Sequence, residues 1–252
     1  MIASPHNEKL KLVRKLRERK HREREGLFAT EGEDLVEAGL TAGVEPRLVL
    51  VAAGSGLFAD RGDAAEEVEP DLLAEVSTLG SGTRAIAVWP ERWAEAAQPP
   101  CVYLHGVGDP GNVGAVVRTA HALLGGTVVL GPACADPYGP KAVRASMGSV
   151  FGQPLLRAGV EVTPEPRAAL VAHGGEGLDE LAAAATVCLG AEREGLPGEV
   201  VARCELRVTI PLRPGAAESL NVAAAAAIAC ERVASAGERL SSPAMREGGS
   251  DA

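Results

Sequence analysis

From residue 101 onward, short apolar runs alternate with segments of helical periodicity, and this alternation constrains the fold most strongly. The strand-like runs are CVYLHGV, TVVLG, RAALVAH, TVCLG and RVTIPL. The segments between and after them predict helices at about 113–124, 140–150, 178–184 and 219–234. Strands joined through helices pair in parallel, and helices cover both faces of such a sheet. The sequence therefore predicts an α/β fold with a mostly parallel sheet.

A smaller α/β unit is predicted ahead of this sheet, in residues 1–90. It begins with a basic helix at 8–24, whose apolar line is Leu10, Val13 and Leu16. The rest of the unit predicts an extended piece at 28–29, a helix ending near 43, a strand at 47–52, a helix at 71–76 and a strand at 84–89.

The boundary between the two units is expected at the proline-rich segment PERWAEAAQPP, which places a linker at 91–100. The second unit then spans residues 101–236. Residues 237–252 are small, polar and charged, and we expect them to form a disordered tail.

Charge is distributed unevenly along the chain. The formal net charge is −9, but residues 7–25 hold nine Lys or Arg and four Glu, which makes that segment +5 and the remainder −14. Such a basic segment permits contacts with nucleic acid, although a solvated charged helix is the common alternative. The candidates for RNA contact here are Lys9, Lys11, Arg14 and Lys15.

Composition also argues against several classes of protein. The five cysteines form no CxxC pair and the histidines form no HExxH motif, so we expect neither a disulfide framework nor a metal site. No run approaches the roughly 20 apolar residues of a membrane span, and no secretory signal is visible at the N-terminus. These features predict a cytoplasmic protein without a membrane partner.

The segment HGVGDPGNVGAVVR follows a predicted strand and opens a helix. Its three leading glycines formally match the GxGxxG pattern of dinucleotide-binding enzymes. Pro110 interrupts that pattern, and the next strand ends at Gly131-Pro132 without the acidic residue that would bind a ribose. An oxidoreductase that uses a nicotinamide cofactor is therefore a weak alternative.

Two polar residues of this segment are stronger candidates for chemistry. Asn112 is expected to begin the helix, where an asparagine can cap free N–H groups, and Arg118 follows six residues later. The alternative for Asn112 is an ordinary helix cap, and the alternative for Arg118 is an ordinary surface residue of the helix.

Two further segments combine small and polar residues at predicted helix starts. In PKAVRASMGSVF, Lys141 and Arg144 lie one helical turn apart. In the last segment Ser219 is a candidate N-cap and Asn221 lies in the first turn, where polar groups meet the positive end of the helix. Gly190 follows a strand and allows a ligand to approach the backbone closely.

Together, the three segments resemble the three motifs of the SpoU family of RNA ribose 2′-O-methyltransferases, which belongs to the SPOUT class. The resemblance spans about residues 101–236. The matching residues are Asn112, Gly114 and Arg118; the segment PKAVRASMGSVF; Gly190-Ala191-Glu192; Ile210-Pro211-Leu212; and Ser219-Leu220-Asn221-Val222. Arg193 departs from the pattern, because relatives often carry glycine there. Residues 8–89 more loosely resemble the RNA-binding domain that often precedes this one.

The resemblance implies a deep trefoil knot, a homodimer, and S-adenosylmethionine as methyl donor without a metal. It places the donor at Gly190, Glu192, Ile210 and Leu220, held largely by backbone groups. The resemblance assigns Arg118 to the reacting ribose hydroxyl. Asn112, Ser219 and Asn221 would help to orient that hydroxyl. Lys141 and Arg144 are candidates for phosphate contacts.

The resemblance favours ribosomal RNA as the substrate, with tRNA as the weaker choice, because the extra N-terminal domain is like those of members that act on rRNA. The modified nucleotide, and a role in housekeeping or in antibiotic resistance, stay open. A non-catalytic RNA-binding protein on the same fold is the main alternative from another class. The motif residues Asn112, Arg118, Ser219 and Asn221 argue against it.

Overall fold

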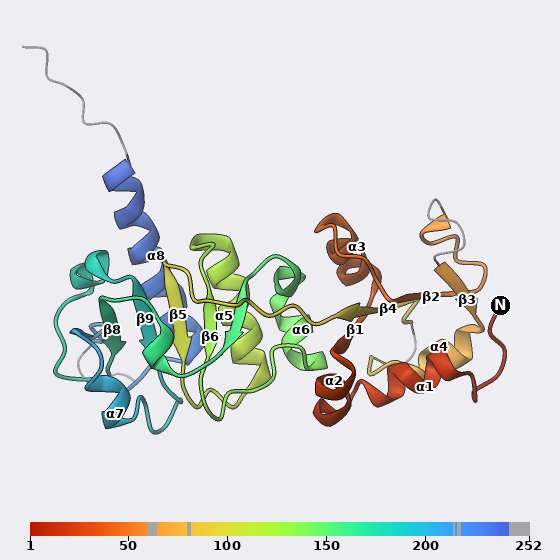
Figure 1. The fold of residues 1–252 in the computed structure, drawn as a ribbon, viewed down its shortest axis with the longest axis horizontal. Helices are drawn as coiled ribbons and strands as arrows, with labels where there is room; N and C mark the ends of the chain where they lie inside the picture. The colour runs from red at the N-terminus through yellow and green to blue at the C-terminus, as the bar shows by residue number, and fades with distance from the viewer. Residues whose placement is uncertain (60–64, 80–81, 214, 216–217, 242–252) are drawn as a thin grey trace, which may run out of the picture.

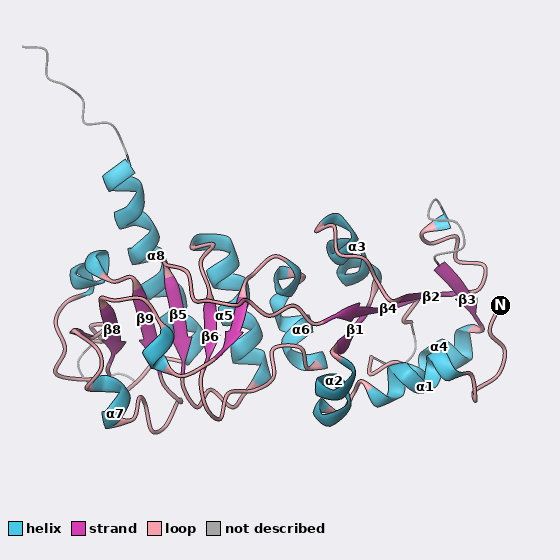
Figure 2. Ribbon diagram, viewed as in Figure 1, coloured by secondary structure: helices cyan, strands magenta, loops and turns pink. Residues whose placement is uncertain are grey.

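The computed structural model describes residues 1–59, 65–79, 82–213, 215 and 218–241. Two sheets lie side by side along the long axis of the molecule (Figure 1). Helices flank both sheets, as the secondary-structure colouring shows (Figure 2).

The N-terminal unit is a mixed four-stranded sheet in the order β1-β4-β2-β3. β4 pairs antiparallel with both β1 and β2, while β2 and β3 are parallel. Its strands are β1 (Leu27–Glu31), β2 (Leu48–Ala52), β3 (Ala65–Val68) and β4 (Ala85–Pro90), and its helices are α1 (Glu8–Lys15), α2 (Arg19–Glu25), α3 (Glu33–Thr41) and α4 (Pro70–Val76). The α/β prediction for this region is confirmed, although β3 was not predicted.

Both faces of this small sheet are buried. Side chains alternate along a strand, so Leu50 and Ile86 face α1 and α4, whereas Val49 and Ala87 belong to a second cluster on the opposite face. That second cluster continues into the C-terminal unit. One face of the sheet therefore holds the basic helix, and the other faces the second unit.

The prediction of one basic helix at 8–24 is wrong, because the segment forms two helices. α1 has its C-cap at Leu16, and Glu18 has extended backbone angles before α2 begins at Arg19. Arg22 accounts for the break: its Nη1 donates to the carbonyl oxygens of Leu16 and Arg17, at 2.8 and 2.9 Å. A side chain thus satisfies carbonyl groups that a continuous helix would have bonded.

The C-terminal unit is a six-stranded sheet in the order β10-β8-β9-β5-β6-β7, and every pairing is parallel. The strands are β5 (Cys101–Leu104), β6 (Val128–Leu130), β7 (Leu155–Arg157), β8 (Arg167–Leu170), β9 (Thr186–Leu189) and β10 (Leu206–Val208). The helices are α5 (Pro110–Leu123), α6 (Pro140–Ser146), α7 (Gly198–Val201) and α8 (Val222–Ser241), with 3-10 turns at 149–151, 160–162 and 178–183. The predicted parallel α/β sheet is confirmed; β7 was not predicted.

Alternation along β5 shows how this sheet is covered. Val102 and Leu104 belong to the cluster formed with α5 and α8, whereas Cys101 and Tyr103 belong to the cluster formed with α7. The near-continuous burial of β5 and β9 follows, because both faces are packed.

Aromatic side chains join the two units. The Phe28 ring lies 4.7 Å from the Tyr138 ring, and the Trp89 ring lies 4.8 Å from the Phe151 ring. The segment predicted as a linker also packs here, since the Trp93 ring meets the Tyr138 ring edge-on at 5.1 Å. The apolar core is continuous across the junction.

Two helix ends differ from the sequence prediction. α6 ends at Ser146, and a 3-10 turn takes the place of its predicted last turn. α8 begins at Val222 and continues to Ser241, so residues 237–241 are helical and the prediction of a disordered tail is wrong for them. The rest of that tail, 242–252, lies outside the described residues. No helix in the described ranges is both long and apolar enough to cross a bilayer.

Candidate active site

A cavity of about 450 Å3 opens where β8, β9 and β10 end at their carboxyl ends. The four residues predicted to hold the methyl donor, Gly190, Glu192, Ile210 and Leu220, all line it, and so does Ser219. Ligands of open parallel sheets bind at this edge. The cavity does not lie at the glycine-rich turn after β5, where the dinucleotide alternative would have required it.

Gly190 is needed because the chain folds back on itself immediately after β9. A Cβ on Gly190 would lie 2.0 Å from the carbonyl carbon of Gly195. The Gly195 N–H donates to the Ala191 oxygen at 2.9 Å, and Gly195 has a φ of +66°. This tight loop forms one wall of the cavity and presents its backbone to a ligand.

We expect Gly190→Ala to weaken S-adenosylmethionine binding roughly tenfold, because overpacking of this kind costs about 1–3 kcal/mol and here displaces a cavity wall. Calorimetric titration measures the affinity. Gly198→Ala is the matched control, since a Cβ there meets nothing within 4 Å. Equal affinity in the two variants would show that the wall does not contact the ligand.

The lining suits a ligand with a flat apolar part and a positive charge. Leu189, Ile210 and Val222 supply apolar surface, and the carboxylates of Glu192 and Glu218 stand at the cavity. S-adenosylmethionine combines an adenine ring with sulfonium and ammonium charges, and the volume lies in the range of small-molecule sites. The residues present therefore fit this group.

A chain of hydrogen bonds connects α8, α5 and the loop after β9. The Ala223 N–H donates to Asn221 Oδ1 at 2.9 Å, Asn221 Nδ2 donates to Asn112 Oδ1 at 3.1 Å, and Asn112 Nδ2 donates to Glu192. These bonds orient both amides. Three residues that lie far apart in the sequence, Asn112, Glu192 and Asn221, thus meet at the mouth of the cavity, where Glu192 belongs to the lining and the two asparagines lie outside it.

In both helices, the residue that caps the N-terminus differs from the predicted one. Asp109, not Asn112, caps α5, because its Oδ1 accepts from the Asn112 N–H at 3.0 Å. Asn221, not Ser219, caps α8. Asn112 is thereby free to use its side chain at the cavity mouth.

Asp109 also fixes Lys141, one of the predicted RNA contacts. Lys141 Nζ lies 2.7 Å from Asp109 Oδ2. The Lys141 ammonium, together with the Asn112 N–H, holds the pKa of the Asp109 carboxyl below its usual range. The start of α6 is thus tied to the start of α5.

Gly114 allows α5 and α6 to approach closely, since a Cβ there would lie 2.3 Å from the Ala142 oxygen. This packing brings the first and second motifs side by side. Arg144 on α6 points to the N-terminal unit, where its Nη1 donates to Thr78 Oγ1 at 2.9 Å.

Arg118 is not part of the hydrogen-bond chain that links Asn221, Asn112 and Glu192. It is exposed on α5, and no side-chain hydrogen bond or ion pair joins it to another residue in the described part of the chain. A separation of six residues advances about 9 Å along a helix and turns to another face. The structure therefore brings Asn112, Asn221 and Glu192 together but leaves Arg118 open to solvent.

The basic residues of α1 contact acids of their own unit. Lys9 pairs with Glu66, Lys11 with Glu8 at 2.7 Å, and Arg14 with Glu75 at 3.0 Å. Lys15 is exposed. The ion pairs are partly exposed and weak, so these cations can exchange partners.

Sequence reasoning missed two parts of the cavity lining, the segment 170–173 at the end of β8 and Glu218. The segment at the end of β8 could have been predicted from the sequence. Parallel strands end at the same edge of a sheet, so the residues after RAAL are expected to lie beside those after TVCL.

The fold and the cavity together define an α/β enzyme that binds a nucleoside-like ligand at the carboxyl edge of a parallel sheet. The model of the SpoU rRNA Methylase family matches residues 99–231, and that of the MRM3-like substrate binding domain matches residues 7–87. The chain belongs to the SpoU rRNA methylase family.

Two relatives illustrate this similarity. The 23S rRNA (guanosine(2553)-2′-O)-methyltransferase RlmP of Bacillus subtilis is 31% identical over 240 residues, covering 90% of this chain and 96% of the relative. The 23S rRNA (adenosine(1067)-2′-O)-methyltransferase of Streptomyces laurentii is 33% identical over 217 residues, covering 79% of this chain and 73% of the relative. An AdoMet-bound rRNA methyltransferase structure from Sinorhizobium meliloti has a TM-score of 0.78 and 26% identity, covering 96% of this chain and 98% of that one.

Proposed function

We propose that this protein transfers a methyl group from S-adenosylmethionine to a ribose 2′-hydroxyl of 23S rRNA. Membership of the SpoU family supports the reaction, and the relatives from Bacillus subtilis and Streptomyces laurentii are named for 23S rRNA. The observation that carries the proposal is the convergence of Asn112, Asn221 and Glu192 at the mouth of the cavity.

When bound, S-adenosylmethionine supplies an activated methyl group, so the protein has to orient the ribose and manage one proton. The amides of Asn112 and Asn221 hold fixed directions and orient the hydroxyl. Arg118 binds the phosphate beside the target ribose and stabilises negative charge on the oxygen. An arginine is a poor general base, because its guanidinium group stays protonated in proteins.

Resemblance to the family supports three further proposals. We propose that the C-terminal sheet is threaded as a deep trefoil knot, that the chain acts as a homodimer, and that it works in the cytoplasm. Leu220 completes the donor site, Ser219 helps to orient the ribose hydroxyl, and Lys141 and Arg144 add phosphate contacts. tRNA is the less favoured substrate.

Mapping of 2′-O-methylation in total RNA tests the function. Cells that lack the gene should lose methylation at one nucleotide of 23S rRNA, and the wild-type gene should restore it. Loss at a tRNA position would reassign the substrate. An unchanged map, with no S-adenosylmethionine binding by calorimetry, would favour the non-catalytic RNA-binding alternative.

Methyl transfer should not need a metal ion. The described residues hold no group of three or more His, Cys, Asp or Glu side chains placed for a metal. Because the methyl group of S-adenosylmethionine is already activated, we expect EDTA to leave the initial rate unchanged, measured with a purified protein and an rRNA transcript. Loss of activity in EDTA, with the circular dichroism spectrum intact and activity restored by added metal, would contradict this.

Charge reversal in the basic segment should weaken RNA binding. Lys15→Glu with Arg17→Glu removes two exposed cations, and each lost phosphate contact reduces the salt slope of binding by about 0.7–0.9. Filter binding at several salt concentrations measures the slope, and S-adenosylmethionine affinity serves as the control that should stay constant. An unaltered slope would identify this segment as a solvated face.

A further inference from the structure

A second cavity, of about 340 Å3, lies at the carboxyl ends of β6 and β7, where the sheet meets α2. The C-terminal unit lines it with residues 130–135 and 157–159, and the N-terminal unit contributes Arg19. None of these residues belongs to the three family motifs. The cavity therefore requires both units and is separate from the donor site.

The two cavities flank the same loop. The Gly106 N–H donates to the Pro132 oxygen at 3.0 Å, and the Ala135 N–H donates to the Val107 oxygen at 2.9 Å, so the wall of the second cavity is bonded to the β5–α5 loop. On its other side, a Cβ on Gly106 would lie 3.4 Å from the Cβ of Ala191, which lines the donor cavity. A substrate that lies across this loop reaches both cavities.

The charged side chains that line the second cavity are Arg19 and Arg157. Arg19 Nε and Arg157 Nη1 both donate to Glu23 Oε1, at 2.8 and 3.0 Å, which holds the two guanidinium groups beside each other. The terminal nitrogens of Arg19 have no partner among the residues that the structure describes. A free guanidinium fork binds a phosphate through two parallel hydrogen bonds.

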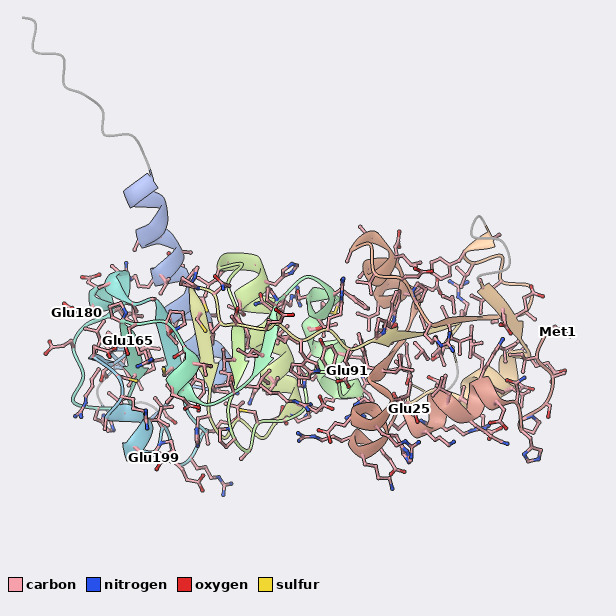
Figure 3. The ribbon with its side chains drawn as sticks, in the orientation of Figure 1. Met1, Glu25, Glu91, Glu165, Glu180 and Glu199 are labelled. Atoms are coloured by element: carbon pink, nitrogen blue, oxygen red, sulfur yellow. The ribbon has the colours of Figure 1, made fainter. Side chains whose placement is uncertain are left out.

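Of the nearby carboxylates, Asp136 and Glu91 are bonded outside the cavity, whereas Glu161 lies beside the lining residue Gly159. Asp136 accepts from Arg22 and Arg157, and Glu91, labelled between the two units in Figure 3, accepts from the Trp93 indole at 3.0 Å. Neither acid lines the cavity, and Glu23 does not line it either. Among the charged side chains, the cavity lining itself thus contains two arginines, of which Arg19 has free terminal nitrogens within the described residues.

The remaining wall is built from small residues that leave room for a flat group, and they are Gly131, Pro132, Ala133, Cys134, Ala135, Ala158 and Gly159. Ala133 has a φ of +59°, a left-handed conformation that an alanine rarely adopts. Backbone strain of this kind gathers at ligand sites, where the surrounding structure maintains it.

We propose that the second cavity binds a nucleotide of the substrate RNA close to the methylated one. The phosphate lies on Arg19 and Arg157, and the base lies against the small residues of the loop after β6. This inference rests on the proposed function, because it assumes an RNA substrate across the β5–α5 loop. It assigns substrate recognition to residues outside the family motifs.

Two half-buried cysteines provide a probe of the cavity and an internal reference. Cys134 lines the second cavity, whereas Cys204 lies between α7 and β10, and each thiol donates to a backbone oxygen at 3.3 Å. Burial raises the pKa of the Cys134 thiol, so alkylation by iodoacetamide is followed at alkaline pH by peptide mass spectrometry. A 23S rRNA transcript at ten times its Kd should slow alkylation of Cys134 about tenfold and leave Cys204 unchanged.

Arg19→Gln tests the phosphate contact, with Arg24→Gln as the control on the same helix. Both arginines are exposed ion-pair partners of a glutamate, but only Arg19 lines the cavity. We expect Arg19→Gln to raise the Kd for the rRNA transcript about tenfold, so that the wild-type RNA concentration slows Cys134 alkylation only about twofold. The control should stay within about twofold, and S-adenosylmethionine affinity should be unchanged in both.

Equal RNA affinity in the two variants, or equal alkylation of Cys134 with and without RNA, would overturn the inference. Wild-type methylation of the transcript, measured in parallel, separates the two proposals. If methylation proceeds while Cys134 stays unprotected, the function holds and the second cavity is not an RNA site. If no RNA is methylated, the proposed function itself fails.

Discussion

Arg118→Ala is expected to slow methyl transfer in a single turnover roughly 100- to 1,000-fold while the fold and S-adenosylmethionine affinity stay intact. The loss corresponds to about 3–4 kcal/mol, the usual cost of removing one charge-assisted contact made mainly in the transition state. Arg118 is exposed and does not line the donor cavity, so its removal should disturb neither packing nor donor binding.

Single-turnover methylation at saturating RNA and donor isolates this step from binding. Arg118→Lys should restore little, because an ammonium cannot reproduce the planar fork that contacts phosphate and ribose together. His121→Ala, one turn further along the same exposed helix face, is the control and should retain the wild-type rate. A rate within a few-fold of wild type for Arg118→Ala would identify Arg118 as an ordinary surface residue.

The parallel sheet could be predicted from the sequence because its strands are apolar on both faces. Two strands, β3 and β7, were not predicted, and each has a physical reason. β3 has the sequence AEEV and lies at a sheet edge, so only Val68 is buried and the strand gives no apolar run. β7 has three residues, of which only Leu155 is fully buried. Edge strands pack on fewer neighbours and therefore leave a weaker pattern.

The candidate residues of the cavity were predicted through the family motifs, whereas their connections needed the structure. Asn112 and Asn221 are 109 positions apart, and no periodicity indicates that their amides bond to each other. The N-cap of α5 could have been predicted correctly as Asp109 instead of Asn112. Proline favours the first helical position, so Pro110 makes the residue before it the N-cap. Once Asp109 takes the capping role, Asn112 is available for the substrate.

The break between α1 and α2 was not predictable from local sequence, because a distant residue stabilises it. Neither glycine nor proline occurs between Leu16 and Arg19. Arg22 Nε and Nη2 donate to Asp136 Oδ2 at 3.0 and 2.7 Å, and both side chains are almost fully buried, at 4% and 6% exposure. A contact over 114 positions thus sets the local conformation of the basic segment.

Arg22→Ala should therefore destabilise the protein by about 3–5 kcal/mol, since removing one partner leaves a buried carboxylate without its main counter-charge. Arg157, at 3.2 Å from Asp136, remains and should hold the loss toward the lower end of that range. Urea unfolding followed by circular dichroism measures the change. Arg24→Ala is the control, because Arg24 is 60% exposed and, among the described residues, pairs only with its neighbour Glu25, so its loss should cost less than about 1 kcal/mol.

A double variant, Arg22→Met with Asp136→Leu, distinguishes the uncompensated charge from the loss of packing. Replacing both members of a buried pair by apolar side chains is often close to neutral, so the double variant should be more stable than Arg22→Ala. It still lacks the bonds from Arg22 to the Leu16 and Arg17 carbonyls, and therefore should not recover fully. If the double variant is no more stable than Arg22→Ala, the ion pair matters less than those two carbonyl bonds, and the junction between the units depends mainly on the helix break.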